Sequence, residues 1–241
     1  MHRRFQIDID ICEVKGVKYN TWLLELVDIV NAYDDRGLNT NVSDFKCWEV
    51  VSYYIGSTFK SPVLEVEDYG LLDSIYSAID RKLTPYTSFN GRKTSYHIEA
   101  FDLKAPQISF LAKRFFASLN VFRKMNQDKD YLDDVDFDFS DFDPMKIDVS
   151  NTELYPLFEN AFTLSFSKFA KTGMISFSVA QACFKSEQIL NWLKLFTHMV
   201  EKSKNLPEAR SLPQVETGKE FIRQWEIDKS LGDWILKLCA E

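Results

Sequence analysis

Residues 161–200 read AFTLSFSKFAKTGMISFSVAQACFKSEQILNWLKLFTHMV and decide the predicted fold class. Two runs in the first half, 162–167 and 175–179, alternate apolar with small polar residues. Alternation at period two is typical of strands that bury one face. Lys171, Thr172 and Gly173 separate the runs, and Gly173 can adopt the positive φ that a short hairpin loop needs. The first half therefore predicts a β-hairpin.

The second half of the same stretch predicts a helix. Ser186 can cap its start, and Glu187 is favoured in the first turn by the helix dipole. The apolar positions that share one helical stripe are Ile189, Trp192, Leu193, Phe196 and Val200. A hairpin whose apolar face packs on such a helix indicates an α+β fold, with an antiparallel β-sheet packed against helices.

The rest of the chain extends this pattern as a single domain over residues 1–241, with 67–155 as an insertion that contributes helices and an acidic loop. Alternation or apolar runs predict strands at 5–11, 63–66, 96–100 and 234–238. Apolar residues at spacings of three and four predict helices at 21–30, 45–55, 70–83 and 107–125.

Composition limits the classes of function. The chain carries a net charge of −7, so we do not expect a general binder of nucleic acid or anionic membrane unless its cations cluster. The four cysteines are scattered without a CxxC pair, which indicates reduced thiols in an intracellular protein. No run of about 18 apolar residues occurs, and the N-terminus does not read as a signal peptide.

Catalytic signatures are scarce, and we predict no enzyme, no cofactor and no metal site. The three histidines, His2, His97 and His198, are too few for a multi-histidine metal centre. No GxGxxG, Walker A, GxSxG or HExxH motif occurs. Arg92 and His97 have a spacing at which such residues face one phosphate in some helical ribonucleases, but Asn90-Gly91 favours a turn there. A metal-dependent nuclease built on carboxylates that the sequence does not place stays open as a second alternative.

An acidic and aromatic segment covers residues 126–148. Eight aspartates between positions 128 and 143 are interleaved with phenylalanines, and the spacing does not fit an EF-hand, which needs Gly at position six and Glu at position twelve. We expect a mobile acidic loop. The residues proposed to dock a partner are Asp136, Phe137, Asp138, Phe139 and Phe142. A protein-interaction module of intracellular or phage origin, acting through this loop, is the first alternative function.

Basic residues gather at two places. Arg3 and Arg4 lie near the N-terminus, and a second group lies on the predicted helix 107–125. The candidate contacts for an anionic membrane or a phosphate-bearing partner are Arg3, Arg4, Lys113, Arg114, Arg123 and Lys124. An ordinary solvated helix face is the alternative interpretation of the helical group.

The order of elements resembles a matrix protein of the rhabdovirus, vesiculovirus-like kind. Three stretches carry the resemblance: FQIDIDICEVKGVKYNTWLLELVDIVNAY (5–33), FKCWEVVSYYIGS (45–57), and the hairpin and helix of 161–200 followed by EIDKSLGDWILKL (226–238). They are similar to that family's opening strand and helix, its following helix, and its closing elements, the last being a strand that contains a Trp.

The resemblance implies a non-enzymatic structural protein of the virion. Such a protein self-associates as a homo-oligomer, condenses the nucleocapsid by binding the viral nucleoprotein, and contributes to budding. It contacts the inner membrane surface peripherally and weakly, and it is found in the virion and in the host cytoplasm. Unidentified host proteins are further expected partners.

Overall fold

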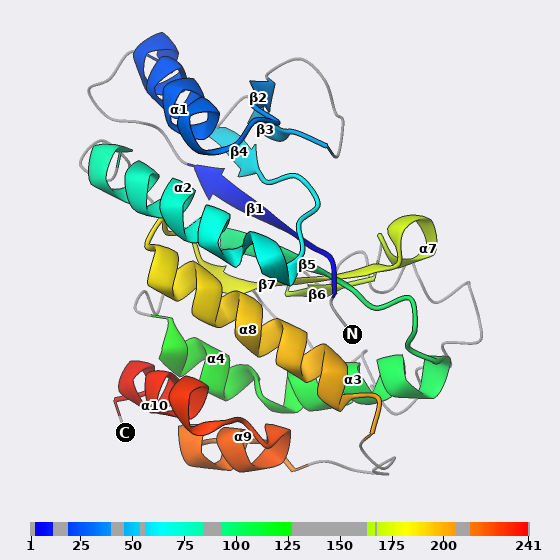
Figure 1. Ribbon diagram of the computed structural model, residues 1–241. Coiled ribbons are helices and arrows are strands. Elements are labelled where there is room, and N and C mark those ends of the chain that lie inside the picture. Colours follow the sequence, from blue (N-terminus) through cyan, green and yellow to red (C-terminus); the bar gives the residue numbers. More distant parts are fainter. Residues whose placement is uncertain are drawn as a thin grey trace. The chain divides into compact units, whose positions relative to one another are not determined.

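The computed structural model describes residues 3–11, 19–39, 46–53, 56–83, 93–126, 163–166, 168–205 and 213–240 (Figure 1). Within these ranges the fold is α+β, as predicted, and seven strands are hydrogen-bonded in the order β2-β3-β4-β1-β5-β7-β6. The pairs β1–β4, β3–β4 and β6–β7 are antiparallel, whereas β2–β3 is parallel. The sheet is therefore mixed, and not wholly antiparallel as the sequence suggested.

The strands are β1 (Phe5–Ile11), β2 (Leu38–Asn39), β3 (Trp48–Tyr53), β4 (Gly56–Lys60), β5 (Lys93–Glu99), β6 (Leu164–Ser165) and β7 (Met174–Gln181). The helices are α1 (Tyr19–Tyr33), the 3-10 helix η1 (Val66–Asp68), α2 (Tyr69–Leu83), α3 (Ala105–Ala117), α4 (Leu119–Met125), α7 (Phe169–Thr172), α8 (Ser186–Lys202), α9 (Gly218–Trp225) and α10 (Lys229–Leu238).

The chain divides into two compact units. Unit 1 comprises residues 1–97 and 180–193, and unit 2 comprises residues 98–179 and 194–241. Helix α2 and strand β5 both fall inside the range 67–155 that the sequence suggested as an insertion. Strand β5 takes a place within the sheet between β1 and β7. This part of the range therefore contributes to the core of the fold.

Unit 1 is held together by apolar side chains on one face of its strands. The predicted alternation in β1 is confirmed, since Phe5, Ile7, Ile9 and Ile11 are all buried. Rings from β3, β4 and α2 meet on this face: Trp48 stacks on Phe59 with centroids 5.2 Å apart, and Tyr76 meets both edge to face. Figure 1 shows α2 running beside β1.

The helix predicted at 45–55 is wrong, because Trp48–Tyr53 forms strand β3. Strand β3 pairs with β4 in the register Val50↔Phe59, and Val50 and Trp48 are both buried. Apolar residues at 48 and 51 satisfy helical spacing, but those at 48 and 50 satisfy strand spacing equally well. The β-branched valines and the pairing with β4 favour the strand.

Unit 2 is built around aromatic packing between β7 and α8. Phe177 stacks on Phe196 with centroids 4.6 Å apart, and Phe115 of α3 lies 5.7 Å from Phe177. Helix α8 begins in the unit 1 range and continues into unit 2, and its predicted stripe is confirmed along the whole helix: the buried members are Ile189, Trp192, Leu193, Phe196 and Val200.

The predicted hairpin is confirmed in its pairing but not in its loop. Leu164 of β6 lies opposite Phe177 of β7. Short helix α7 occupies the connection where the sequence suggested a tight turn. Gly173 ends α7 in the left-handed region at φ 71°, so the predicted need for a glycine is confirmed. Phe162 and Ser167 lie outside the described residues.

The helix predicted at 107–125 is two helices, with α3 ending and α4 beginning around Ser118. The Ser118 hydroxyl donates to the carbonyl of Arg114, 2.8 Å away, and accepts from the Trp225 indole at 3.4 Å. A serine that bonds back to the preceding turn competes with the helical ladder and bends it.

The closing strand predicted at 234–238 is also wrong, because these residues belong to helix α10. Asp228 caps this helix by accepting a hydrogen bond from the Leu231 N–H at 3.1 Å. Leu231 and Ile235, four residues apart, are both buried, which is helical spacing.

Candidate functional site

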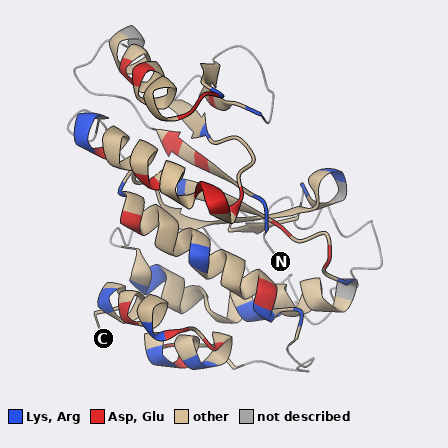
Figure 2. Ribbon diagram, viewed as in Figure 1, with Lys and Arg blue, Asp and Glu red and all other residues tan. Residues whose placement is uncertain are grey.

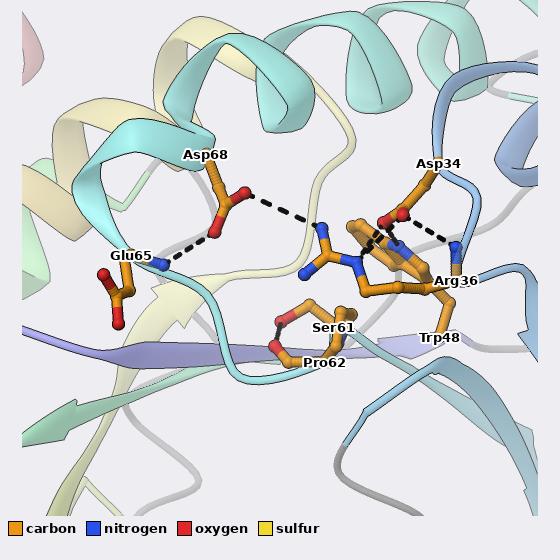
Figure 3. Close-up of polar contacts among 7 residues, drawn as sticks. All are labelled: Asp34, Arg36, Trp48, Ser61, Pro62, Glu65 and Asp68. Carbon is orange, nitrogen blue, oxygen red and sulfur yellow. Dashed lines mark hydrogen bonds and ion pairs between the residues drawn. The ribbon is translucent and has the colours of Figure 1, made fainter.

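A buried carboxylate in unit 1 organises the largest set of polar side-chain contacts in the close-up view (Figure 3). Asp34 follows the last turn of α1, and its N–H donates to the Val30 carbonyl at 2.8 Å. One oxygen accepts from the Arg36 N–H at 3.0 Å, and Arg36 Nε reaches both oxygens at 2.8 and 2.9 Å. The Trp48 indole donates to the other oxygen at 2.6 Å. We call Asp34, Arg36, Trp48 and Asp68 the Asp34 cluster.

The contacts of Asp34 decide its charge. Burial opposes ionisation, but hydrogen bonds from the Arg36 side chain, the Trp48 indole and the Arg36 N–H outweigh it, so the pKa of Asp34 is lowered. For Arg36, burial alone would lower the pKa. The hydrogen bond to Asp34 and the negative charges of Asp34 and Asp68 outweigh burial, so the pKa of Arg36 is raised. Both groups are therefore charged at neutral pH.

The second contact of Arg36 joins the cluster to the start of α2. Arg36 Nη2 lies 3.7 Å from Asp68 Oδ1, and Asp68 accepts from the Glu65 N–H at 2.9 Å. The cluster thus connects the end of α1, the start of β3 and helix η1. An ionised carboxylate with this many donors is a poor general base, because a proton must displace them. We infer a structural role for it.

A polar ladder crosses the other face of the unit 1 strands. Lys60 of β4 lies in register with Asp8 of β1 on one side and with Glu49 of β3 on the other. His97 of β5 extends the ladder, with its Nε2 3.0 Å from Asp8 Oδ2. On the next rung the Thr58 hydroxyl donates to Asp10 at 2.8 Å.

A carboxylate-bound imidazole is the arrangement that orients a general base in many hydrolases. His97 is only 4% exposed, so a substrate does not reach it in this structure. Arg92, its partner in the nuclease alternative, lies outside the described residues. His97 also sits on a strand, whereas that alternative places the pair on a helix.

Burial keeps three further groups of unit 1 in their neutral forms: the Cys183 thiol and the hydroxyls of Tyr76 and Tyr96. Burial raises the pKa of the Cys183 thiol to about 11, so this thiol is protonated at neutral pH and is a weak nucleophile. Burial, with smaller contributions from neighbouring ionisable groups, also raises the pKa values of Tyr76 and Tyr96 well above the ordinary value.

The predicted basic residues near the N-terminus lie in different environments. Arg3 is 3% exposed, whereas Arg4 is exposed. Of this pair, Arg4 is therefore the side chain placed to meet a surface.

The basic residues of α3 and α4 are used largely within unit 2. Arg114 Nη1 donates to the carbonyl of Gln224, near the end of α9, and its guanidinium lies 4.5 Å from the Phe110 ring centre. Burial lowers the pKa of Arg114, although it remains cationic.

The two basic residues of α4 also make internal contacts. Lys124 donates to the Glu216 carbonyl at 2.6 Å, and Arg123 donates to Asn120 at 3.1 Å. Lys113 is half-exposed, without an ion pair or a hydrogen bond to its side chain among the described residues. The contacts of Arg114 and Lys124 hold α9 and the residues just before it against α3 and α4, a role that sequence spacing did not reveal.

The docking loop Asp136, Phe137, Asp138, Phe139 and Phe142 lies outside the described residues, so it stays a prediction. Among the residues that are described, no group of three or more His, Cys, Asp or Glu side chains is placed to hold a metal ion. No helix in the described ranges is long and apolar enough to span a membrane.

Sequence reasoning missed the Asp34 cluster and the Asp8–His97 pair for different reasons. Asp34 and Arg36 are two residues apart after an apolar helix, a local signal that was open to interpretation. Asp8 and His97 are 89 positions apart, and only strand order brings them together.

Comparison with known proteins gives no relative to place beside this geometry. No family model matches the chain, and no curated protein and no solved structure is detectably similar to it.

Proposed function

We propose that this protein is a non-enzymatic structural protein that acts by self-association and by binding partners. The observation that carries the proposal is the state of three ionisable groups among the described residues of unit 1. Asp34 is bound by several donors, His97 is bound to Asp8, and Cys183 is protonated. Acid–base and nucleophilic catalysis need such groups within reach of a substrate. Asp34 and His97 are instead buried and bound to other side chains, and the Cys183 thiol is in its less nucleophilic protonated form.

A matrix protein of the rhabdovirus kind is the specific form of this proposal. Residues 5–33 supply strand β1 and helix α1 in the order that the resemblance implies. The stretches 45–57 and 226–238 fold differently from the elements that it implies, so the opening stretch is its main support. In this role the protein self-associates, binds the viral nucleoprotein and the inner membrane surface, and acts in the virion and the host cytoplasm.

The membrane part of the proposal depends on basic side chains that are exposed to solvent. Each basic side chain near an anionic surface contributes about 1 kcal/mol. Arg4 is exposed and Lys113 is half-exposed, whereas Arg114, Arg123 and Lys124 bind groups within unit 2. The net charge of −7 opposes binding. We therefore expect weak binding to anionic vesicles that disappears as salt is raised.

Sedimentation with vesicles of phosphatidylserine and phosphatidylcholine tests the membrane part. Arg4→Glu combined with Lys113→Glu should release the protein into the supernatant at low salt. The matched control combines Arg4→Glu with Lys237→Glu, where Lys237 is exposed on α10 outside the predicted set, and it should retain more binding. Wild-type protein that stays in the supernatant at low salt overturns the membrane part of the proposal.

The choice of variants follows from the structure. Reversing Arg114 or Lys124 to Glu places an acid against a backbone carbonyl in or just before α9 and disturbs the docking of this helix. Loss of vesicle binding in such a variant would then report on unfolding as well as on charge. Circular dichroism of each variant at the assay temperature separates these causes.

A further inference from the structure

Phe101 is the most exposed large aromatic side chain among the described residues of unit 2, at 61%. Its backbone is fixed by the junction between α7 and β7. The Ala100 N–H donates to the Gly173 carbonyl at 2.7 Å, and the Leu103 N–H donates to the Ala100 carbonyl at 2.9 Å. An apolar ring held outward on a rigid backbone is typical of an anchor for a partner.

Gly173 explains how the backbone comes so close to Phe101. Its φ is 71°, and a Cβ at this position would lie 2.9 Å from the Phe101 Cβ. A larger residue at 173 would be strained by φ and would also displace Phe101. The position of the exposed ring is therefore set by the same glycine that ends α7.

Two lysines lie close in sequence to Phe101 and Gly173. Lys104 follows Phe101 by three residues and is exposed at the start of α3, and Lys171 is exposed in α7, two residues before Gly173. Neither side chain makes an ion pair with the described residues. The intervening acid, Asp102, is bound by Lys204 at 2.7 Å. Figure 2 shows the basic colour on α7.

We propose that Phe101, Lys104 and Lys171, which we call the Phe101 surface, bind the acidic–aromatic segment 133–143 of a second copy of this chain. The segment reads DDVDFDFSDFD, with phenylalanines interleaved among aspartates and no cation. Its chemistry complements an exposed aromatic ring and two exposed lysines, one three residues after the ring and one two residues before the glycine that contacts it: ring packing provides the contact, and the opposite charges favour association and register. The inference rests on the self-association in the proposed function and names its two surfaces.

A synthetic peptide of residues 133–143, labelled at its N-terminus, tests the surface directly by fluorescence anisotropy. Phe101→Ser in the full chain should weaken peptide binding by about tenfold or more, as expected for an aromatic anchor. The matched control is Leu24→Ser on α1 of unit 1, a side chain of similar exposure at 63%, which should leave the affinity unchanged. Equal affinity of the wild type and Phe101→Ser overturns the proposal.

Charge and ring contributions are separable with further variants. Combined Lys104→Gln and Lys171→Gln should flatten the dependence of peptide affinity on salt, because fewer opposite charges remain to be screened. A peptide with Phe137, Phe139 and Phe142 replaced by Ser keeps every aspartate and should bind at least about tenfold more weakly. Undiminished binding of that peptide means simple charge attraction, and the proposed site is then wrong.

Sedimentation velocity of the full chain distinguishes binding between copies from binding within one copy. Phe101→Ser should reduce self-association, and so should a full-length variant with Phe137, Phe139 and Phe142 replaced by Ser. Mixing the two variants should restore a dimer, because one intact surface then meets one intact segment. No restoration overturns the pairing of these two surfaces.

The result also separates this inference from the proposed function. If the wild type associates and Phe101→Ser associates equally, the inference is wrong and self-association uses another surface. If the wild type stays monomeric at every concentration, self-association itself is wrong.

Discussion

Asp34 in unit 1 and Arg114 in unit 2 each join a helix to a later part of the chain, but they do so with different degrees of enclosure. The Asp34 side chain is 2% exposed and accepts from Arg36 and Trp48. Arg114 is half-exposed and donates to a backbone carbonyl near the end of α9. Removing a buried charge leaves its partners without a hydrogen-bond acceptor in the protein interior, whereas water can replace a contact at the protein surface. Charges that look equivalent in sequence therefore differ in their contribution to stability.

Asp34→Ala should have the largest effect. It leaves the Arg36 guanidinium and the Trp48 indole without their shared acceptor, and we expect a loss of about 3 kcal/mol in the free energy of unfolding. Urea titration followed by tryptophan fluorescence measures it. Asp35→Ala, at the exposed neighbouring position, is the control and should change the free energy by less than about 0.5 kcal/mol. Equal losses in the two variants would mean that Asp34 is not enclosed.

Acidification should distinguish Asp34 from its amide. The pKa of Asp34 is lowered in the folded state from the ordinary 3.8. Its stabilising contribution is then complete above the unfolded pKa and disappears as pH falls through the lower folded pKa. Asp34→Asn has no carboxyl to protonate at position 34. Its free energy of unfolding should therefore decline less than that of the wild type as the pH falls from about 5 through the folded-state pKa of Asp34.

Urea midpoints measured at several pH values between neutral and acid give this comparison. Glu220 and Glu226 also have lowered pKa values, caused first by backbone hydrogen bonds at Glu220 and by the Lys202 contact at Glu226. Some acid dependence should therefore remain in Asp34→Asn. Parallel curves for the wild type and the amide variant would count against the assigned charge of Asp34.

Arg114→Met should have an intermediate effect. The variant keeps most of the apolar stem but loses the donor to the Gln224 carbonyl and the cation–π contact with Phe110, so we expect a loss of about 1–2 kcal/mol. Lys113→Met, one position away and half-exposed, is the matched control and should be nearly neutral. A loss for Arg114→Met as large as that for Asp34→Ala would remove the contrast between the two units.

Lys124→Met should have the smallest effect. Lys124 is exposed, and water can replace its bond to the Glu216 carbonyl, so a change within about 0.5 kcal/mol is expected. Lys219→Met, at an exposed position on α9, gives the baseline for removing a surface lysine. A loss above 1 kcal/mol for Lys124→Met alone would show that the rim contacts of unit 2 act together and not singly.

The sequence pattern predicted correctly those elements in which buried residues recur at a single spacing, either every second residue or every third and fourth. Strand β1 and the stripe of α8 were foreseen because alternation and spacings of three and four are set by the backbone geometry of a strand or a helix. The residues at 48–53 satisfied both periods in part, and the pairing of Val50 with Phe59 decided the outcome. Residues 234–238 were misassigned because Asp228, the cap of α10, lies outside the short window that was interpreted as a strand.

The sequence by itself determined the α+β class, the glycine at 173 and the core faces of the clearest elements, because these depend on neighbours within a few residues. Only the tertiary structure decided which charged side chains bind other groups of the protein. Asp8 meets His97 over 89 positions, and Arg114 meets Gln224 over 110. Such contacts depend on strand order and helix docking, which no spacing in the sequence encodes. The predicted basic group is the clearest instance: its residue types suggested a free surface, and the fold uses two of its members, Arg114 and Lys124, to bind backbone carbonyls in and just before α9.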